Sequence, residues 1–340
     1  MRAIWTTRTG GPETLEVRQT PDPEPGPSEI RIRVRAAGLN FADVMARQGM
    51  YPDAPKLPTI MGYECAGAID RVGADVRSLR EGDRVLALPH FGGQADTVCV
   101  PQEYAFRIPE TMSFEHAAAL PVVYLTAYHM LFNVARIRSG DHVLVHMAAG
   151  GVGMAALQLC RTVSGVVTYG TASAHKHAFV RAQGCDHAID YRTLDYATEI
   201  RRLTDGRGVN VILDALGGKD WKKGYDLLAP AGLLIGFGFA NMNAGGGKRN
   251  LWHMANQAAR IPLYTPLKLM GDNRGVAGVN MGHLWGERAL LRAALERVLE
   301  LYVEGKISPH LEAAVPFDRA ADAHRLLETG KNTGKVVLVP

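Results

Sequence analysis

Three glycines close together in the middle of the chain have the spacing of a phosphate-binding loop. They are Gly150, Gly151 and Gly153, and they lie in the stretch HMAAGGVGMAALQL, residues 146–159. An apolar run precedes them and a helix-like run follows, which is the setting in which G-x-G-x-x-G motifs bind a dinucleotide. Ala148 replaces the first glycine. We expect Gly150 to let the backbone approach phosphate and Gly153 to let the helix pack on the strand. The alternative is a plain glycine-rich turn.

The end of the next expected strand indicates which nucleotide binds. After VVTYG the chain reads GTASAHKH, residues 170–177, with no acidic side chain. NAD sites place Asp or Glu here for the ribose hydroxyls, whereas Ser173 and Lys176 suit a 2′-phosphate. The sequence therefore favours NADPH. The alternatives are that Lys176 is a solvated lysine at a helix start and that His175 and His177 are surface residues.

The elements around these motifs predict an α/β protein of two domains. Short alternating strands broken by Gly and Pro fill the first 120 residues and predict an antiparallel, barrel-like domain. After residue 121, helices alternate with short apolar strands, which predicts a doubly wound parallel sheet. The chain closes with a strand-like KVVLVP that resembles the first domain. We expect residues 1–123 and 283–340 to form one domain, with residues 124–282 inserted as the dinucleotide-binding domain.

Composition excludes several other classes of protein. The 38 basic and 34 acidic residues give a net charge of +4, too even to indicate a nucleic acid or membrane surface as partner. No apolar run reaches the length of a membrane span, and MRAIWTTRTGG lacks a secretory pattern, so we expect a cytoplasmic enzyme. The four cysteines form no CxxC pair and predict separate, mostly buried thiols. His142 and His146 flank a strand, where four residues span roughly 13 Å, too far for one metal ion.

Several motifs together resemble a known family. GLNFADVMARQGMYP, GYE, AALPVVYLTAYHML, HMAAGGVGMAALQL and GTASAHKH are similar to the zinc-free, zeta-crystallin-like quinone oxidoreductases of the medium-chain dehydrogenase/reductase superfamily. ALGGKDWKKGYDLLAP, GKRNL and GVAGVNMGHLWGE narrow the resemblance to its synaptic vesicle membrane protein branch, the vesicle amine transport homologues. The resemblance implies a GroES-like catalytic domain, a Rossmann domain, and NADPH in the cleft between them. It also implies a homodimer through the edge strand near residues 276–282.

The resemblance further implies that the protein needs no metal. Zinc-bearing relatives place Cys and His where this chain has Asn40 in GLNFAD and Tyr63 in GYE. Neither side chain is a good zinc ligand. The branch has been linked to vesicles, but no polybasic run or lipidation signal supports membrane association.

The cofactor site carries over from the family residue by residue. Gly150, Gly151, Val152 and Gly153 would hold the pyrophosphate, and Ser173 and Lys176 the 2′-phosphate, with Tyr191 nearby. The family pattern assigns the nicotinamide side and the region before the final strand to these further residues: Thr126, Gly236, Phe237, Gly238, Asn241, Lys331 and Asn332.

The substrate side carries over to Asn40, Tyr51 and Asp43. Asn40 can donate a hydrogen bond to a carbonyl oxygen, and Tyr51 is a candidate acid or lid residue. Two structural alternatives stay open. Asn40 can cap a helix that starts at Phe41, and Asp43 can pair with Arg47 four residues further along that helix.

We therefore expect zinc-independent transfer of a hydride from NADPH to quinones or α,β-unsaturated carbonyls. Hydrogen bonds would meet the oxyanion in place of a metal, so an electron-poor acceptor is expected. The alternatives are an enoyl-thioester reductase and a non-enzymatic NADPH-binding factor resembling the vesicle proteins. The glycines at residues 245–247 and the prolines at 262 and 266 also suggest a mobile or irregular segment.

Overall fold

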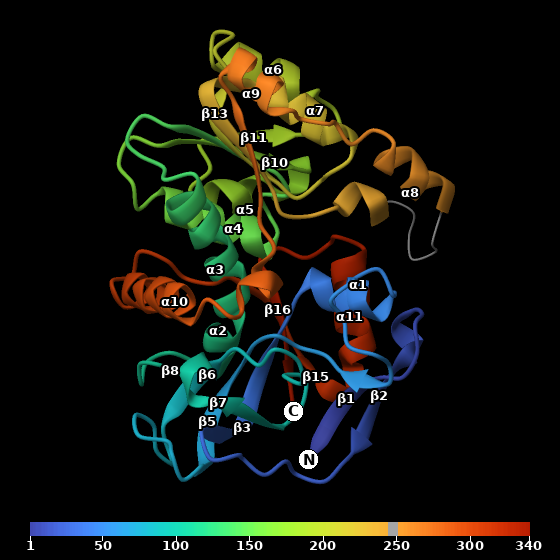
Figure 1. Ribbon diagram of the computed structural model, residues 1–340, viewed down its shortest axis with the longest axis vertical. Coiled ribbons are helices and arrows are strands. Elements are labelled where there is room, and N and C mark those ends of the chain that lie inside the picture. Colours follow the sequence, from blue (N-terminus) through green and yellow to red (C-terminus); the bar gives the residue numbers. More distant parts are fainter. Residues whose placement is uncertain (244–250) are drawn as a thin grey trace. The chain divides into compact units, whose positions relative to one another are not determined.

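The computed structural model describes residues 1–243 and 251–340, and the chain forms two compact units (Figure 1). Unit 1 joins Met1–Leu125 with Met281–Pro340, and unit 2 is the continuous stretch Thr126–Asn280. The sequence had placed these boundaries at residues 123/124 and 282/283. Both termini of the described chain belong to unit 1, where the last strand (Lys335–Val339) pairs with the strand Glu29–Leu39. The glycines at 245–247 lie outside the described residues.

Unit 1 is built mainly from antiparallel strands in two sheets. The larger sheet has the order β15-β16-β3-β5-β6-β8, with β7 paired to β3, and the smaller has the order β2-β1-β4. Only β15 and β16 run parallel to each other. The strands are β1 (Arg2–Thr6), β2 (Leu15–Gln19), β3 (Glu29–Leu39), β4 (Thr59–Ile60), β5 (Cys65–Val72), β6 (Arg84–Ala87), β7 (Thr97–Pro101), β8 (Ala105–Arg107), β15 (Leu311–Pro316) and β16 (Lys335–Val339).

Strand β3 lies between β16 and β5 in the larger sheet, and its side chains alternate. Ile30, Ile32 and Val34 enter the core, as a period of two predicts for a strand. Arg31 and Arg33 both bind Asp70 on β5, with Nε–O distances of 2.9 Å and 2.7 Å. The helices of the unit are α1 (Phe41–Arg47), α2 (Phe114–Ala119), α10 (Arg288–Val303) and α11 (Ala320–Glu328), while α3 (Pro121–Tyr128) crosses into unit 2.

Unit 2 is a doubly wound parallel sheet. Its strand order is β11-β10-β9-β12-β13-β14, and every pair is parallel. The chain moves outward from β9 in one direction and then in the other, so the sequence order reverses between β9 and β12. In such folds ligands bind at this switch point, beyond the carboxyl ends of the strands. The strands are β9 (His142–Val145), β10 (Val167–Ala172), β11 (His187–Asp190), β12 (Val209–Asp214), β13 (Leu228–Gly236) and β14 (Gly275–Gly278).

The crossovers of unit 2 are short helices. They are α4 (Gly151–Cys160), α5 (His177–Ala182), α6 (Tyr196–Leu203), α7 (Lys219–Tyr225), α8 (Leu251–Ala258) and α9 (Pro266–Asp272). The π-helix η3 (His129–Val134) precedes β9. A core of its own, with Leu144, Ile189 and Ile212 at the centre of the strands, holds the sheet together. None of the helices in the described ranges is long and apolar enough to cross a membrane.

Candidate functional site

The glycine loop lies between β9 and α4, at the carboxyl edge of the sheet. Gly150 is the N-cap residue of α4 and carries no side chain to bond the first amides, which leaves them available to a ligand. A Cβ on Gly150 would meet only the Met147 carbonyl oxygen, at 3.3 Å. A Cβ on Gly153 would lie 2.5 Å from the same oxygen and 2.7 Å from Ala148 Cα. Gly153 is therefore required for packing, whereas Gly150 lies at an open surface that a phosphate can approach.

The end of β10 carries the residues expected to select the nucleotide. Ser173 and Lys176 are both buried, with Lys176 only 9% exposed. The alternative of a solvated lysine at the helix start is therefore wrong for Lys176, because the fold covers its side chain. His175 is exposed, as that alternative proposed, while His177 is half-buried and its Nε2 lies 3.1 Å from the Ala172 carbonyl oxygen.

The other predicted cofactor residues of unit 2 lie on several different elements. Gly236 ends β13, and Phe237 and Gly238 follow it. Tyr191 follows β11 and is exposed. Asn241 donates through Nδ2 to the Gly217 carbonyl oxygen at 2.9 Å and to Asp220 Oδ2 at 2.7 Å. Thr126 is buried on α3.

Two predicted cofactor residues, Lys331 and Asn332, lie in unit 1 between α11 and β16. Lys331 is exposed, and Asn332 donates through Nδ2 to the Gly334 carbonyl oxygen at 3.2 Å. They belong to a different unit from the glycine loop.

A buried polar pair beneath the loop was not assigned from the sequence. Asp214 ends β12, and its Oδ1 accepts from the amides of Leu216 and Gly217 at 2.7 Å and 2.9 Å. His146 follows β9, and its Nδ1 lies 3.1 Å from Thr171 Oγ1. Burial lowers the pKa of His146 and raises that of Asp214, so both tend toward the neutral form. These contacts hold the loops that follow β9 and β12.

In unit 1, strand register brings three distant residues together. Leu39 at the end of β3 is paired with Val336 near the start of β16, and Ala37 is paired with Cys65 at the start of β5. The residues next to these pairs are Asn40, Lys335 and Glu64. We call these three residues the Lys335 cluster. Glu64 and Lys335 were not assigned from the sequence, although each is a charged residue at the edge of an apolar run.

Every hydrogen of the Lys335 ammonium has an acceptor. It donates to the Leu39 carbonyl oxygen at 3.0 Å, to Asn40 Oδ1 at 2.8 Å and to Glu64 Oε1 at 2.6 Å. Asn40 Nδ2 donates to the same Glu64 oxygen at 2.8 Å. Glu64 Oε2 accepts from the Val122 amide at 2.7 Å. The carboxylate, the ammonium and the amide therefore form one buried hydrogen-bond network.

Asp43 supports the backbone next to this cluster. Its Oδ2 accepts from the Asn40 amide at 2.8 Å and its Oδ1 accepts from the Gly62 amide at 3.2 Å. Asn40 is the N-cap residue of α1, as one alternative proposed. Burial raises the pKa of Asp43 to about 7, against the opposing effects of these amides and of Lys335.

The proposed pair between Asp43 and Arg47 is wrong. Arg47 is fully buried and binds Glu328 on α11 and the Gly10 carbonyl oxygen, while its Nε donates to His324 Nδ1 at 3.3 Å. Asp43 turns back toward the start of α1, whereas Arg47 contacts α11. A spacing of four residues on a helix does not predict an ion pair when each of the two side chains has stronger partners.

Tyr51 lies in an aromatic group with Tyr63. Their ring centroids are 6.3 Å apart at 77°, and Phe91 contacts Tyr63 at 5.0 Å. Burial, and then nearby acidic groups, raise the pKa of both phenols. Both hydroxyls therefore stay protonated and able to donate across the physiological range.

Metal-ligating side chains do not gather in the described part of the chain. Within residues 1–243 and 251–340, no three His, Cys, Asp or Glu side chains gather as metal ligands. All four cysteines are free, and burial raises the pKa of Cys65 to about 12, which disfavours the thiolate that zinc needs. His142 Nδ1 instead lies 2.8 Å from the Tyr169 hydroxyl.

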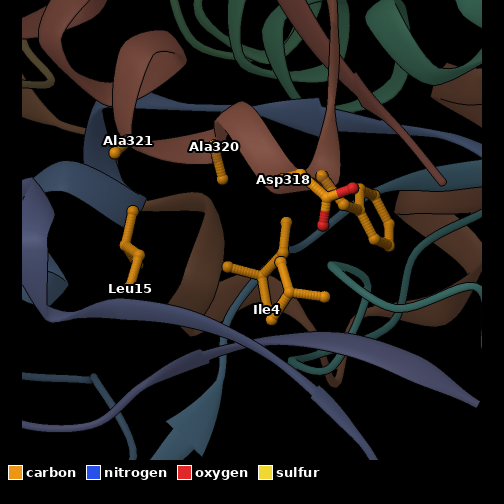
Figure 2. Close-up of a pocket in the computed structure, with 7 residues that line it drawn as sticks. Ile4, Leu15, Asp318, Ala320 and Ala321 are labelled. Atoms are coloured by element: carbon orange, nitrogen blue, oxygen red, sulfur yellow. The ribbon is translucent and has the colours of Figure 1, made fainter.

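A small cavity in unit 1 does not coincide with any of these groups. Figure 2 shows its apolar lining between β1, β2 and the start of α11, and its volume is about 180 Å³. Asp318 supplies its one acidic group and is held by Arg2 Nη2 at 2.9 Å. Sites for small molecules are typically about 300–1,000 Å³, so this cavity is too small for a substrate.

Comparison with known proteins identifies the family. Residues 26–110 match the family described as Alcohol dehydrogenase GroES-like domain, and residues 183–338 match the one described as Zinc-binding dehydrogenase. The chain belongs to the medium-chain dehydrogenase/reductase family of oxidoreductases. The resemblance drawn from the motifs is thus confirmed, although the donor set departs from the zinc-binding description.

Particular relatives resemble the chain over its whole length. The synaptic vesicle membrane protein VAT-1 homolog of Homo sapiens is 46% identical and covers 100% of this chain and 86% of that protein. An Escherichia coli quinone oxidoreductase solved in complex with NADPH has a TM-score of 0.88 and 28% identity, with 100% of both chains covered. The CurK enoyl reductase has a TM-score of 0.84 and 29% identity, covering 99% of this chain and 98% of that one.

Proposed function

We propose that this protein is a zinc-independent reductase that uses NADPH to reduce quinones or α,β-unsaturated carbonyls. The observation that carries the proposal is the combination of an uncapped glycine-rich helix start with a β10 end that bears Ser173 and Lys176 and no acid. The similarity to a quinone oxidoreductase in complex with NADPH supports the same cofactor.

The residues of unit 2 fit this cofactor. The open surface at Gly150 and the first amides of α4 suit a pyrophosphate, because they combine free donors with the positive end of the helix. Ser173 and Lys176 suit the 2′-phosphate, because a hydroxyl and a cation both bind a dianion. When bound, NADPH supplies the hydride.

The residues of unit 1 meet the needs of a carbonyl acceptor. Reduction places negative charge on the acceptor oxygen, and a hydrogen-bond donor must stabilise it in the absence of a metal. The Asn40 amide and the Tyr51 hydroxyl are neutral donors suited to this role. The raised pKa values of Tyr51 and Tyr63 keep them in the donating form.

Two other functions use the same residues. An enoyl-thioester reductase is supported by the similarity to the CurK enoyl reductase. A non-enzymatic NADPH-binding factor is supported by the similarity to the VAT-1 homolog, whose name describes a vesicle membrane protein.

NADPH oxidation with a panel of acceptors separates these functions. The panel is a benzoquinone, a naphthoquinone, an enone, a crotonyl thioester and an aldehyde, each with and without a chelator and each repeated with NADH. We expect turnover of the quinones or the enone with NADPH, unchanged by the chelator. Preference for the thioester would favour the enoyl reductase. Binding of NADPH with no turnover of any acceptor would favour the non-enzymatic factor.

Lys176→Ala tests the assignment of the 2′-phosphate. Because the buried Lys176 would make a charge-assisted contact to that phosphate, we expect the KM for NADPH to rise by about tenfold or more. The KM for NADH should change by less than about twofold, since NADH lacks this phosphate. His175→Ala, at the neighbouring exposed position, is the control. Equal losses with both cofactors would show that Lys176 only supports the fold.

We also propose a homodimer through β14. This strand pairs only with β13 among the described strands, so its other edge is free for pairing. Leu267 and Met270 on α9, just before it, are exposed apolar residues. Sedimentation velocity should give about twice the chain mass, and a monomer at micromolar concentration would contradict this.

A further inference from the structure

We propose that Lys335 and Glu64 are positioning residues that act through Asn40. Together they fix the direction of the Asn40 amide, and the Lys335 ammonium strengthens it as a donor to the acceptor's carbonyl oxygen. The inference rests on the proposed function, since it names how the substrate site of that reductase is held ready. It assigns a role to a buried cation where zinc-bearing relatives use a metal.

The Lys335 cluster permits only one direction of the Asn40 side-chain amide. An ammonium group can only donate and a carboxylate can only accept. Lys335 Nζ lies 2.8 Å from Asn40 Oδ1, and Glu64 Oε1 lies 2.8 Å from Asn40 Nδ2. A flipped amide would set N–H against ammonium and oxygen against carboxylate. The two charges therefore fix the amide more firmly than neutral partners would.

One N–H donor of the Asn40 side-chain amide is left over. The Nδ2 group carries two hydrogens, and Glu64 takes one of them. The described residues provide no second hydrogen-bond partner for Nδ2. Asn40 is 8% exposed, while Lys335 is 3% and Glu64 0% exposed. Asn40 is therefore the member of the cluster that a ligand would reach.

Lys335 also increases the strength of that donor. A cation on the oxygen of an amide draws electron density away from its N–H groups, and bonds in such a chain reinforce one another at low dielectric. The positive charge of Lys335 thus acts on the acceptor oxygen by polarising the amide of Asn40. The neutral amide makes the contact, and the buried ammonium polarises it.

The fold leaves space for the Glu64 carboxylate. A Cβ on Gly38 would overlap Glu64 Oε1 and the Ala118 carbonyl oxygen. Gly38 lies on β3, one residue before Leu39, whose carbonyl oxygen accepts from Lys335. The Val122 amide holds the other oxygen of Glu64 at 2.7 Å. The site is therefore constructed around this carboxylate.

The test uses two acceptors that differ in electron demand. A quinone is already electron-poor, whereas an enone depends more on polarisation of its oxygen as it takes up a hydride and then a proton from solvent. The ratio of kcat for cyclohexenone to kcat for 1,4-benzoquinone does not depend on the amount of folded protein. In Lys335→Met we expect this ratio to fall by about tenfold, as for a weakened oxyanion donor. A ratio within twofold of the unaltered protein overturns the inference.

A double-mutant cycle identifies the route through Asn40. In an Asn40→Ala background, Lys335→Met should change the ratio by less than about twofold, because the amide that carries the effect is gone. A full tenfold loss in that background contradicts the route. Lys306→Met is the control, since Lys306 is an exposed lysine of the same unit paired with Glu304 at 2.6 Å.

A lone charge left in the core can unfold a protein, so the neutral double variant Glu64→Gln/Lys335→Met is measured as well. It removes both charges and should show the same fall in the ratio. If it keeps the unaltered ratio, the charges have no positioning role.

A spectroscopic readout separates this inference from the proposed function. The Nδ2 protons of Asn40, identified by their loss in Asn40→Asp, are followed by NMR while the unreactive ketone cyclohexanone is added with NADPH present. We expect one of the two signals to move in the unaltered protein and not in Lys335→Met. A shift without turnover of any acceptor refutes the reductase but keeps the carbonyl contact. Turnover without a shift keeps the reductase and overturns the inference.

Discussion

Replacing Gly153 with valine should abolish measurable NADPH binding and destabilise unit 2. A Cβ at this position would lie 2.5 Å from the Met147 carbonyl oxygen and 2.8 Å from the Ala148 carbonyl carbon, both backbone atoms. Since backbone cannot rotate away, α4 must move from β9, and overpacking of this kind costs about 2–3 kcal/mol. A displaced α4 takes its free amides and the positive end of its dipole away from the pyrophosphate, which weakens NADPH binding. Calorimetric titration and thermal unfolding measure the two effects.

Two other glycines separate these effects. Gly271→Ala is the matched control, because nothing lies within 4 Å of the added Cβ and the residue is within α9. It should leave both NADPH binding and stability unchanged or slightly improved. Gly150→Ala should keep the stability but weaken NADPH binding, since its Cβ meets only one atom of the protein. If Gly153→Val binds NADPH normally, the loop does not hold the cofactor.

Replacing Arg47 with methionine should be the most destabilising change in unit 1. The guanidinium is fully buried and binds three groups: Glu328, the Gly10 carbonyl oxygen and His324. Removing one member of a buried ion pair costs about 3–5 kcal/mol, because the remaining polar groups lose their partners. Burial lowers the pKa of His324 to about 3, so its ring is neutral and cannot replace the lost cation. Urea unfolding gives the change in free energy.

The comparison variant for Arg47 lies on α11. Arg325→Gln removes an arginine that is exposed and paired with Asp322 at 3.0 Å, and it should cost less than about 1 kcal/mol. Arg47→Lys should recover little stability, because an ammonium cannot reach three partners that a planar fork contacts together. Equal losses for Arg47→Met and Arg325→Gln would show that the buried pair contributes nothing.

The sequence predicted the elements of the fold well where a repeating pattern was strong. The alternation in EIRIRVRAAGL predicted β3, and the apolar runs HVLVHM and VNVILDAL predicted β9 and β12. Strand β15 was missed because LEAAVP is rich in alanine and ends in proline, so it lacks the β-branched residues typical of strands. A local sequence pattern therefore predicts a strand whose own side chains favour it, but not a strand that forms mainly because of the neighbouring strands.

The candidate site was predictable only in its local part. The glycine loop and the acid-free end of β10 lie within single motifs and were found. The Lys335 cluster was not, because Lys335 and Glu64 are 271 residues apart and meet only through the register of three strands. The pairing of Asp43 with Arg47 was wrong for the same reason: their true partners include residues that the helix pattern does not contain.

The division of the chain has a consequence for how the protein is made. Unit 2 is one continuous stretch, so it can fold while the ribosome is still producing the rest. Unit 1 needs Met281–Pro340, and Glu64 meets its cation only when β16 has left the ribosome. Contacts over such separations form slowly, since the chain must close a long loop first. A newly made chain therefore holds the Glu64 carboxylate without its cation until β16 has been made.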